Sequence, residues 1–216
     1  MRTKKIEEVL TNIGFCYGCL SESILTTRKP DGSINAAPMG IIRVDPNHLK
    51  VKPYKSSQTF LNLIKRPKAC VNTTNNPELF LVTAFKQENL RAFSHPKFHS
   101  DLSIEQADAT IFLEKMEGRD ISNERSSFVG EVTSIKIFKK VPAVLNRGRA
   151  QTVEAIIHAT RIEYFLEKKN LLEAKAQINK FNECREVVGR VSLVGSLEAR
   201  VIEALEKMIE QWRAKV

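Results

Sequence analysis

The sequence predicts a small antiparallel β-barrel followed by a C-terminal α-helical subdomain. Five or six β-rich runs lie between residues 23 and 139, and some of them alternate apolar and polar side chains, which is typical of half-buried antiparallel strands. This series of strands implies a closed barrel and not a βαβ fold. From Val144 onward the apolar spacing is helical. We therefore expect a barrel over residues 1–143 and a helical subdomain over residues 144–216.

Length and charge limit the class of protein. The 216 residues can bury a full core, in one domain with an appendage. Lys and Arg outnumber Asp and Glu, 34 against 25, a balance that suits phosphorylated ligands as well as nucleic acid. The basic residues are spread along the chain without a nucleic-acid-binding signature, so we do not expect nucleic acid as a partner. No apolar run is long enough to cross a bilayer, and Met1–Glu8 lacks the apolar stretch of a signal peptide. A cytoplasmic protein without a membrane partner is expected.

The barrel is predicted to begin with a helix and a hairpin. Residues 5–13 have helical spacing, and Gly14 is placed to end that helix. A β-rich run over residues 23–28 meets P-D-G-S at residues 30–33, which offers a fixed φ, an Asx-type side-chain bond and a position for positive φ. These residues predict a turn into a second strand over residues 34–44.

The remaining elements follow by the same rules. The pattern predicts further strands at 48–53, 69–73, 109–117 and 128–139, a short helix at 60–65, and a short helix or irregular turn at 77–85. C-terminal helices are predicted from 144, at 171–181 and at 197–212. Two of the C-terminal helices carry apolar stripes, which we expect to face the core of the subdomain. The stripes are Val153, Ile156, Ile157, Thr160 and Tyr164 in the first helix, and Leu197, Val201, Leu205, Met208 and Trp212 in the third.

The centre of the second predicted strand has an unusual composition. The two alanines and the glycine there offer little side-chain surface for packing, and the proline has no backbone N–H to donate to a neighbouring strand. Strands have such a composition where a large flat group lies against the backbone, although a β-bulge or a barrel corner also uses glycine and proline. The candidate residues are Asn35, Ala36, Ala37, Pro38, Met39 and Gly40.

A polar loop precedes the first helix of the barrel, and it has the character of an anion site. Its hydroxyl groups, an amide and lysines lie at a helix N-terminus, where free N–H groups and the helix dipole favour negative charge. A capped surface helix is the simpler interpretation, but it would need one hydroxyl and not a cluster. The loop residues are Lys52, Tyr54, Lys55, Ser56, Ser57, Gln58 and Thr59.

These stretches together resemble a known family. The order T-T-R-x-P-D-G-S-x-N-A-A-P-M-G, then K-x-x-x-T-x-x-N-L, then V-N-x-T resembles the FMN-binding split-barrel flavoproteins, a group that includes flavin reductases and pyridoxamine-oxidase-like barrels. The chain is most similar to a poorly characterised branch with a helical C-terminal extension, which also carries an N-R-G…A-T-R helix, matched here by residues 146–161. The resemblance covers about residues 20–165.

The resemblance implies an antiparallel split β-barrel that binds FMN, as a homodimer with each flavin in a cleft between subunits. It implies cofactor contacts by Thr59 and Asn62, and a position at the ring edge for Asn72. Three residues of the N-R-G helix are expected to close the site from the other side, namely Asn146, Arg147 and Gln151. Arg147 is placed at a helix start, where the dipole disfavours its charge, and this favours a role beside an anionic flavin.

The resemblance predicts an oxidoreductase that passes electrons or hydride through FMN, with an unknown small-molecule electron donor and acceptor. The sequence shows no nucleophile–base–carboxylate set and no Walker or Rossmann glycine pattern, so the catalytic residues are unknown. The alternative is a non-enzymatic FMN-binding carrier or sensor with a partner-binding helical tail.

Two further groups have a candidate role. Cys16 and Cys19 form one C-x-x-C pair, which is half a zinc site at best; we expect reduced thiols in a turn, with a redox dithiol as the alternative. His95, His99 and Asp101 lie in the hard-to-assign segment 86–107, which we expect to be a loop over the cofactor mouth, and metal binding there is not expected.

Overall fold

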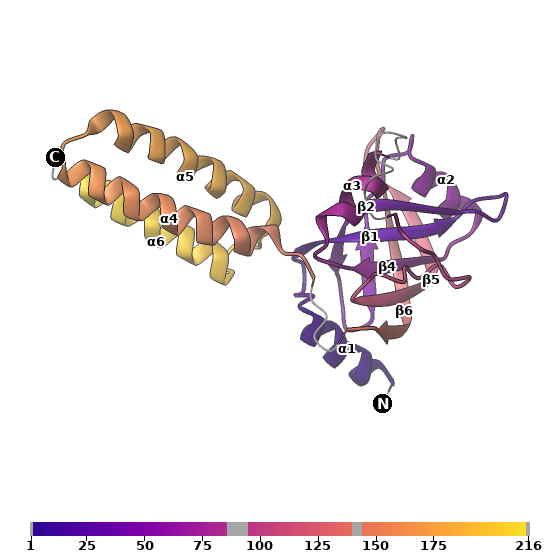
Figure 1. Ribbon diagram of the computed structural model, residues 1–216. Helices are drawn as coiled ribbons and strands as arrows, with labels where there is room; N and C mark the ends of the chain where they lie inside the picture. Colours follow the sequence, from indigo (N-terminus) through magenta and orange to yellow (C-terminus); the bar gives the residue numbers. More distant parts are fainter. Residues whose placement is uncertain (1, 86–94, 140–143, 215–216) are drawn as a thin grey trace. The chain divides into compact units, whose positions relative to one another are not determined.

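The computed structural model describes residues 2–85, 95–139 and 144–214, except for the side chains of Arg2, Pro77 and Phe85. The chain divides into two compact units, Met1–Leu145 and Asn146–Val216 (Figure 1). The boundary predicted at residue 143 lies outside the described residues. We describe each unit by itself.

The first unit is a closed antiparallel barrel with the strand order β1-β2-β3-β6-β5-β4. Its strands are β1 (Leu20–Arg28), β2 (Ile34–Arg43), β3 (His48–Val51), β4 (Ala69–Thr73), β5 (Ala109–Asp120) and β6 (Ser126–Ile137). Three helices accompany them, α1 (Arg2–Ile13), α2 (Gln58–Lys65) and α3 (Pro77–Phe85). The predicted fold class, a β-barrel with a C-terminal helical part, is confirmed.

The β1–β2 hairpin forms for the predicted local reasons. Gly32 has φ +88°, which an L side chain rarely adopts. The Asp31 carboxylate accepts hydrogen bonds from the backbone N–H and the hydroxyl of Ser33, at 2.9 and 2.7 Å, and these bonds lower the pKa of Asp31. The turn sets a register in which Thr27 lies opposite Asn35 and Leu25 lies opposite Ala37.

Each face of the hairpin packs against a different layer. Leu25 and Ile41 belong to the barrel core, because alternate side chains of a strand point to one side. Ile24 and Ala36 point to the other side and pack with Leu79 of α3 in a second apolar cluster. Helix α3 therefore covers the outer face of β1 and β2.

One end of the barrel is closed by α1 through a buried arginine. The side chain of Arg43 is 1% exposed, and its guanidinium lies 4.1 Å from the centre of the Tyr17 ring. It donates to Thr11 Oγ1 at 2.9 Å and to the carbonyl of Phe15 at 3.1 Å, and it lies 3.7 Å from a carboxylate oxygen of Glu7. These bonds satisfy a buried charge and attach α1, with the segment after it, to β2.

The second unit contains the helices α4 (Arg147–Glu167), α5 (Leu171–Val191) and α6 (Leu197–Arg213). Each has a side-chain cap at its N-terminus, supplied by Asn146, Asn170 and Ser196. The three helices pack together around one apolar cluster (Figure 1). The core residues of α4 are Ala155, Ala159, Ile162 and Leu166.

The predicted core face of α4 was wrong. All five of its stripe residues are exposed, with exposed fractions of 37–57% for Val153, Ile156, Ile157 and Tyr164. The opposite face, which carries Ala155, Ala159 and Ile162, is the one that packs against the other two helices. The stripe predicted for α6 is correct in part, because Leu205 is buried and Val201 and Trp212 pack on the core, whereas Leu197 and Met208 are exposed.

Among the described helices, none is long and apolar enough to cross a bilayer.

We expect Arg43→Ala to lower the free energy of unfolding by about 3 kcal/mol, because it removes a buried group and leaves the Phe15 carbonyl without its partner. Urea denaturation measures this change, and hydrogen exchange of the α1 amides reports the loss of the attachment. The exposed Arg119→Ala is the control and should change stability by less than about 0.5 kcal/mol. Equal effects of the two substitutions would contradict the role assigned to Arg43.

Candidate functional site

Four buried polar side chains join α2 to the β1–β2 hairpin. Asn35 Nδ2 donates to Thr59 Oγ1 at 3.2 Å, and Asn62 Nδ2 donates to Thr27 Oγ1 at 2.9 Å. All four residues are at most 3% exposed. Asn35, Thr59 and Asn62 were predicted to contact a ligand directly, but here their side chains bond to other side chains of the protein and position α2 against the hairpin. Thr27 was not predicted, because no local signal connects a strand residue with a helix 30 positions later.

The N-terminus of α2 faces solvent beside this buried network. Ser57 caps the helix, because its hydroxyl oxygen accepts from the N–H of Phe60 at 3.2 Å and its hydroxyl donates to the carbonyl of Tyr54 at 2.7 Å. The next backbone N–H groups, of Gln58 and Thr59, have no preceding helical carbonyl to accept them. The first turn carries no acidic residue. The helix start therefore has the polarity that an anion needs.

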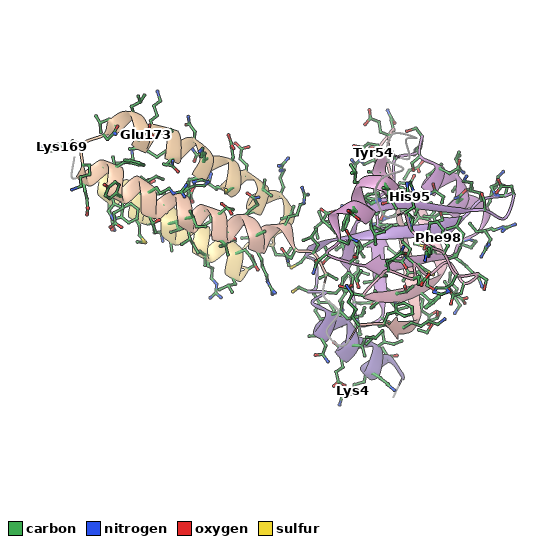
Figure 2. The ribbon with its side chains drawn as sticks, in the orientation of Figure 1. Lys4, Tyr54, His95, Phe98, Lys169 and Glu173 are labelled. Atoms are coloured by element: carbon green, nitrogen blue, oxygen red, sulfur yellow. The ribbon has the colours of Figure 1, made fainter. Side chains whose placement is uncertain are left out.

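The loop before α2 is held by the β5–β6 turn. The backbone N–H of Lys55 donates to the carbonyl of Glu124 at 2.8 Å, and the guanidinium carbon of Arg125 lies 3.7 Å from the centre of the Tyr54 ring. Tyr54 is labelled in Figure 2 and is half exposed. Sequence reasoning did not find Arg125, because it lies in a polar connection some 70 residues away.

The lysines around the loop differ in whether they form an ion pair. Lys55 Nζ lies 2.7 Å from a carboxylate oxygen of Asp120, and this bond, with a second from Ser126, lowers the pKa of Asp120. Lys52 and Ser56 are exposed. Burial, followed by the charges of Lys52 and Arg119, lowers the pKa of Lys50, so several positive charges gather on the surface near β3. Of the two predicted lysines, Lys55 is thus paired with Asp120, and Lys52 is the more exposed one.

The central part of β2 is less open than predicted. Ala36 is 5% exposed beneath α3, and a Cβ at Gly40 would lie 2.6 Å from a methyl group of Leu20. The outer face at these two positions is filled by protein, so small residues serve internal packing there. Ala37, Pro38 and Met39 are half-buried. Because side chains alternate along a strand, Ala37 and Met39 point to one face of β2, where Met39 packs on the barrel core, and Pro38 points to the other.

Asn72 has a structural role in the barrel wall. Its amide nitrogen donates to the carbonyl of Ile24 at 3.2 Å and to Thr26 Oγ1 at 3.0 Å. Its oxygen accepts from the Ile104 N–H at 3.0 Å and from Thr110 Oγ1 at 2.7 Å. The side chain is 0% exposed, and these bonds use its hydrogen-bonding groups. The structure therefore argues against the predicted contact between Asn72 and the edge of a flavin ring.

The three residues predicted to close the site from the C-terminal part lie at the start of α4. Asn146 is the helix cap and accepts from the N–H of Arg149 at 3.1 Å, Arg147 is exposed and Gln151 is half-buried. They belong to the second compact unit, and their role at a flavin site stays a prediction.

The histidine segment packs beside α3. Ile104 and Ala107 are buried in the apolar cluster of Leu79, and Figure 2 shows His95 and Phe98 on the barrel unit. The Asp101 carboxylate is held by Lys136 and Ser103. Among the described residues, no three His, Cys, Asp or Glu side chains are arranged to hold a metal ion. Part of the predicted loop over the cofactor mouth, residues 86–94, lies outside the described residues.

A family model agrees with the sequence resemblance. Residues 21–138 match the family described as "Protein of unknown function (DUF447) N-terminal domain". The match covers β1 to β6, so it includes the whole barrel wall and α2.

Some solved structures are similar to this chain at low sequence identity. An FMN-bound protein of the DUF447 family from Methanosarcina mazei is 19% identical, over 92% of this chain and 98% of that one, with a TM-score of 0.49. Flavoredoxin from Methanosarcina acetivorans is 17% identical, over 56% and 70%, with a TM-score of 0.46. The styrene monooxygenase flavin reductase from Pseudomonas putida S12 is 12% identical, over 62% and 86%, with a TM-score of 0.48.

We predict that Asn72→Ala lowers the free energy of unfolding by about 2–4 kcal/mol, because it leaves several buried polar groups without a partner. Thermal or urea unfolding measures the effect, and the exposed neighbour Asn75→Ala serves as the matched control. A variant that unfolds like the wild type but binds less ligand would instead support the direct contact first predicted.

The four cysteines should react unequally with iodoacetamide. Burial raises the pKa of Cys70 to about 12 and also raises the pKa of Cys184, so both stay protonated at pH 8 and lack the nucleophilic thiolate. Cys16 is exposed and should be labelled first. Mass spectrometry of the native protein distinguishes the sites, and labelling of Cys70 as fast as Cys16 would show that the barrel opens readily.

Proposed function

This chain belongs to the DUF447 family, and we propose that its barrel binds FMN, with the flavin phosphate at the N-terminus of α2. One observation carries the proposal. A buried hydrogen-bond network holds the N-terminus of α2, whose first turn has no acidic residue, beside the half-exposed part of β2. The network consists of Thr27, Asn35, Thr59 and Asn62. A phosphate and a flat ring need these two features side by side.

The residues at the helix start fit a phosphate. The backbone N–H groups of Gln58 and Thr59 and the exposed hydroxyl of Ser56 supply donors, and Lys52 supplies a positive charge. The buried side chains of Thr59 and Asn62 act as positioning residues, because their bonds to the hairpin hold the N–H groups in place. Lys55 contributes less, since Asp120 already pairs with it.

The residues of β2 fit one side of a flavin ring. Pro38 is half-buried and offers apolar surface on the face of β2 that also carries Ala36. Met39 points to the other face and packs against the barrel core. Bound FMN would supply the electron or hydride transfer, and the chain would orient it and control access to it.

We propose further that the protein is an oxidoreductase. The electron donor is a small molecule, and nicotinamide nucleotides, another flavin or a pterin- or deazaflavin-like carrier are the candidate classes. A cytoplasmic location is part of this proposal, because all four cysteines are free thiols, as a reducing compartment maintains them. A homodimer with FMN at the subunit interface is also proposed from the sequence resemblance.

The alternative is an FMN-binding carrier or sensor that uses its helical unit to bind a partner. The exposed stripe of Val153, Ile156, Ile157 and Tyr164 on α4 favours it, because helices expose several large apolar side chains in a row at interaction surfaces. The two proposals differ in redox behaviour. Under argon, NADH or NADPH should bleach the flavin absorption of a nicotinamide-dependent reductase, whereas a carrier or sensor keeps its oxidised spectrum with every donor class named above.

The flavin proposal is tested by comparing FMN with riboflavin, which lacks the phosphate. We expect wild-type protein to bind FMN more tightly, and Lys52→Gln to weaken FMN binding about fivefold, or about 1 kcal/mol, without changing riboflavin binding. Quenching of flavin fluorescence measures both dissociation constants at fixed salt.

Lys65→Gln is the matched control, because it removes the same charge at the other end of α2. It should leave both dissociation constants unchanged. Protein that binds neither flavin would refute the proposed cofactor, and equal loss of FMN affinity in the two variants would refute the proposed phosphate position.

A further inference from the structure

A cavity of about 340 Å³ opens in the barrel unit, away from the start of α2. It lies between the end of β1, the turn from α2 to β4 and the segment after His99. Its lining residues are Arg28, Arg66, Lys68, Ser100, Asp101 and Leu102. The eight residues of α2 separate Arg66 from the helix start by ~12 Å along the helix axis, so the cavity is distinct from the proposed flavin phosphate site.

A fixed guanidinium forms one wall of the cavity. Arg28 Nη1 donates to the carbonyl of Gly32 at 2.8 Å, and Nη2 donates to the carbonyl of Ser100 at 2.5 Å. Both acceptors are neutral, so these bonds hold the side chain without neutralising its charge. A guanidinium positioned in this way still has donors for an anion.

The acidic groups near the cavity already have cationic partners. Asp101 bonds to Lys136 at 2.5 Å and accepts from the hydroxyl and N–H of Ser103, and these bonds hold the pKa of its carboxyl well below the usual range. Lys68 lies 2.9 Å from a carboxylate oxygen of Glu114. Because Asp101 and Glu114 are paired, the charges of Arg28 and Arg66 remain as a local positive surplus within the part of the chain that the structure describes.

The segment that adjoins Arg28 in the cavity lining has a strained backbone that the barrel supports. Leu102 has φ +75°, a conformation that bulky L residues rarely adopt and that recurs at ligand sites. Its carbonyl accepts from Thr26 Oγ1 at 2.6 Å, and the carbonyl of Asp101 accepts from Cys70 Sγ at 3.4 Å. Two buried residues of β1 and β4 therefore hold this segment in shape before any ligand arrives.

We propose that this cavity binds the phosphate group of a small phosphorylated molecule other than the flavin. The surplus of two guanidinium charges matches a phosphate dianion, and the planar donor forks of arginine suit its oxygens. The volume lies at the lower end of small-molecule sites, which suits a phosphate with a short organic part. The site is independent of the proposed flavin binding.

Inorganic phosphate is the probe, titrated calorimetrically against chloride at equal ionic strength, with and without saturating FMN. We expect a dissociation constant of about 1 mM or tighter, and Arg66→Gln with Lys68→Gln should weaken it at least tenfold. Lys65→Gln, which removes an adjacent charge that does not line the cavity, should bind phosphate like the wild type.

The variants separate this proposal from the flavin proposal. Both substituted side chains at Arg66 and Lys68 are exposed, and an unchanged melting temperature confirms folding. Unchanged phosphate affinity in the Arg66→Gln, Lys68→Gln variant would overturn the proposal. Loss of phosphate binding on addition of FMN, or loss of FMN binding in that variant, would also overturn it, because the cavity would then be part of the flavin site.

Discussion

The barrel depends on the short contact that closes it. Strands β1 and β4 pair over three residues, Ile24 with Asn72, Leu25 with Val71 and Thr26 with Cys70. A ladder of this length leaves few backbone hydrogen bonds to resist opening, and an open barrel would expose two strand edges. The buried amide of Asn72 adds side-chain bonds across β1, β4 and β5 at this seam. Both candidate sites use residues that the closed seam holds in position.

In the proposed flavin site, buried residues position the helix, and exposed residues are available to the ligand. Thr59 and Asn62 face the hairpin and determine where α2 begins, whereas Lys52 and Ser56 face solvent. A buried polar network of this kind is favourable when each member has a partner, and it fixes one arrangement. The geometry of the anion site is then rigid before a ligand binds, which reduces the entropic cost of binding.

Ion pairing differs from residue to residue on the basic surface of the barrel unit. Lys55, Lys115 and Lys136 each form an ion pair, and exposed pairs of this kind contribute little stability but cancel local potential. Positive charge is left at Lys52 and at the cavity beside Arg28. The net charge of the chain therefore helps to locate an anion site only after the ion pairs have been assigned.

The sequence by itself determined the local features of this protein. Residue propensities and short-range hydrogen bonds determine the Asp31–Gly32 turn, the Ser57 cap and the positions of the strands and helices. They also determine the segment that carries the proposed anion site. Tertiary structure decided which faces became interior. It covered Ala36 with α3 and turned the alanine face of α4 inward. It also brought Arg28 beside Ser100. These outcomes depend on contacts between residues distant in sequence, where shape and the pairing of buried polar groups choose among faces of similar hydrophobicity.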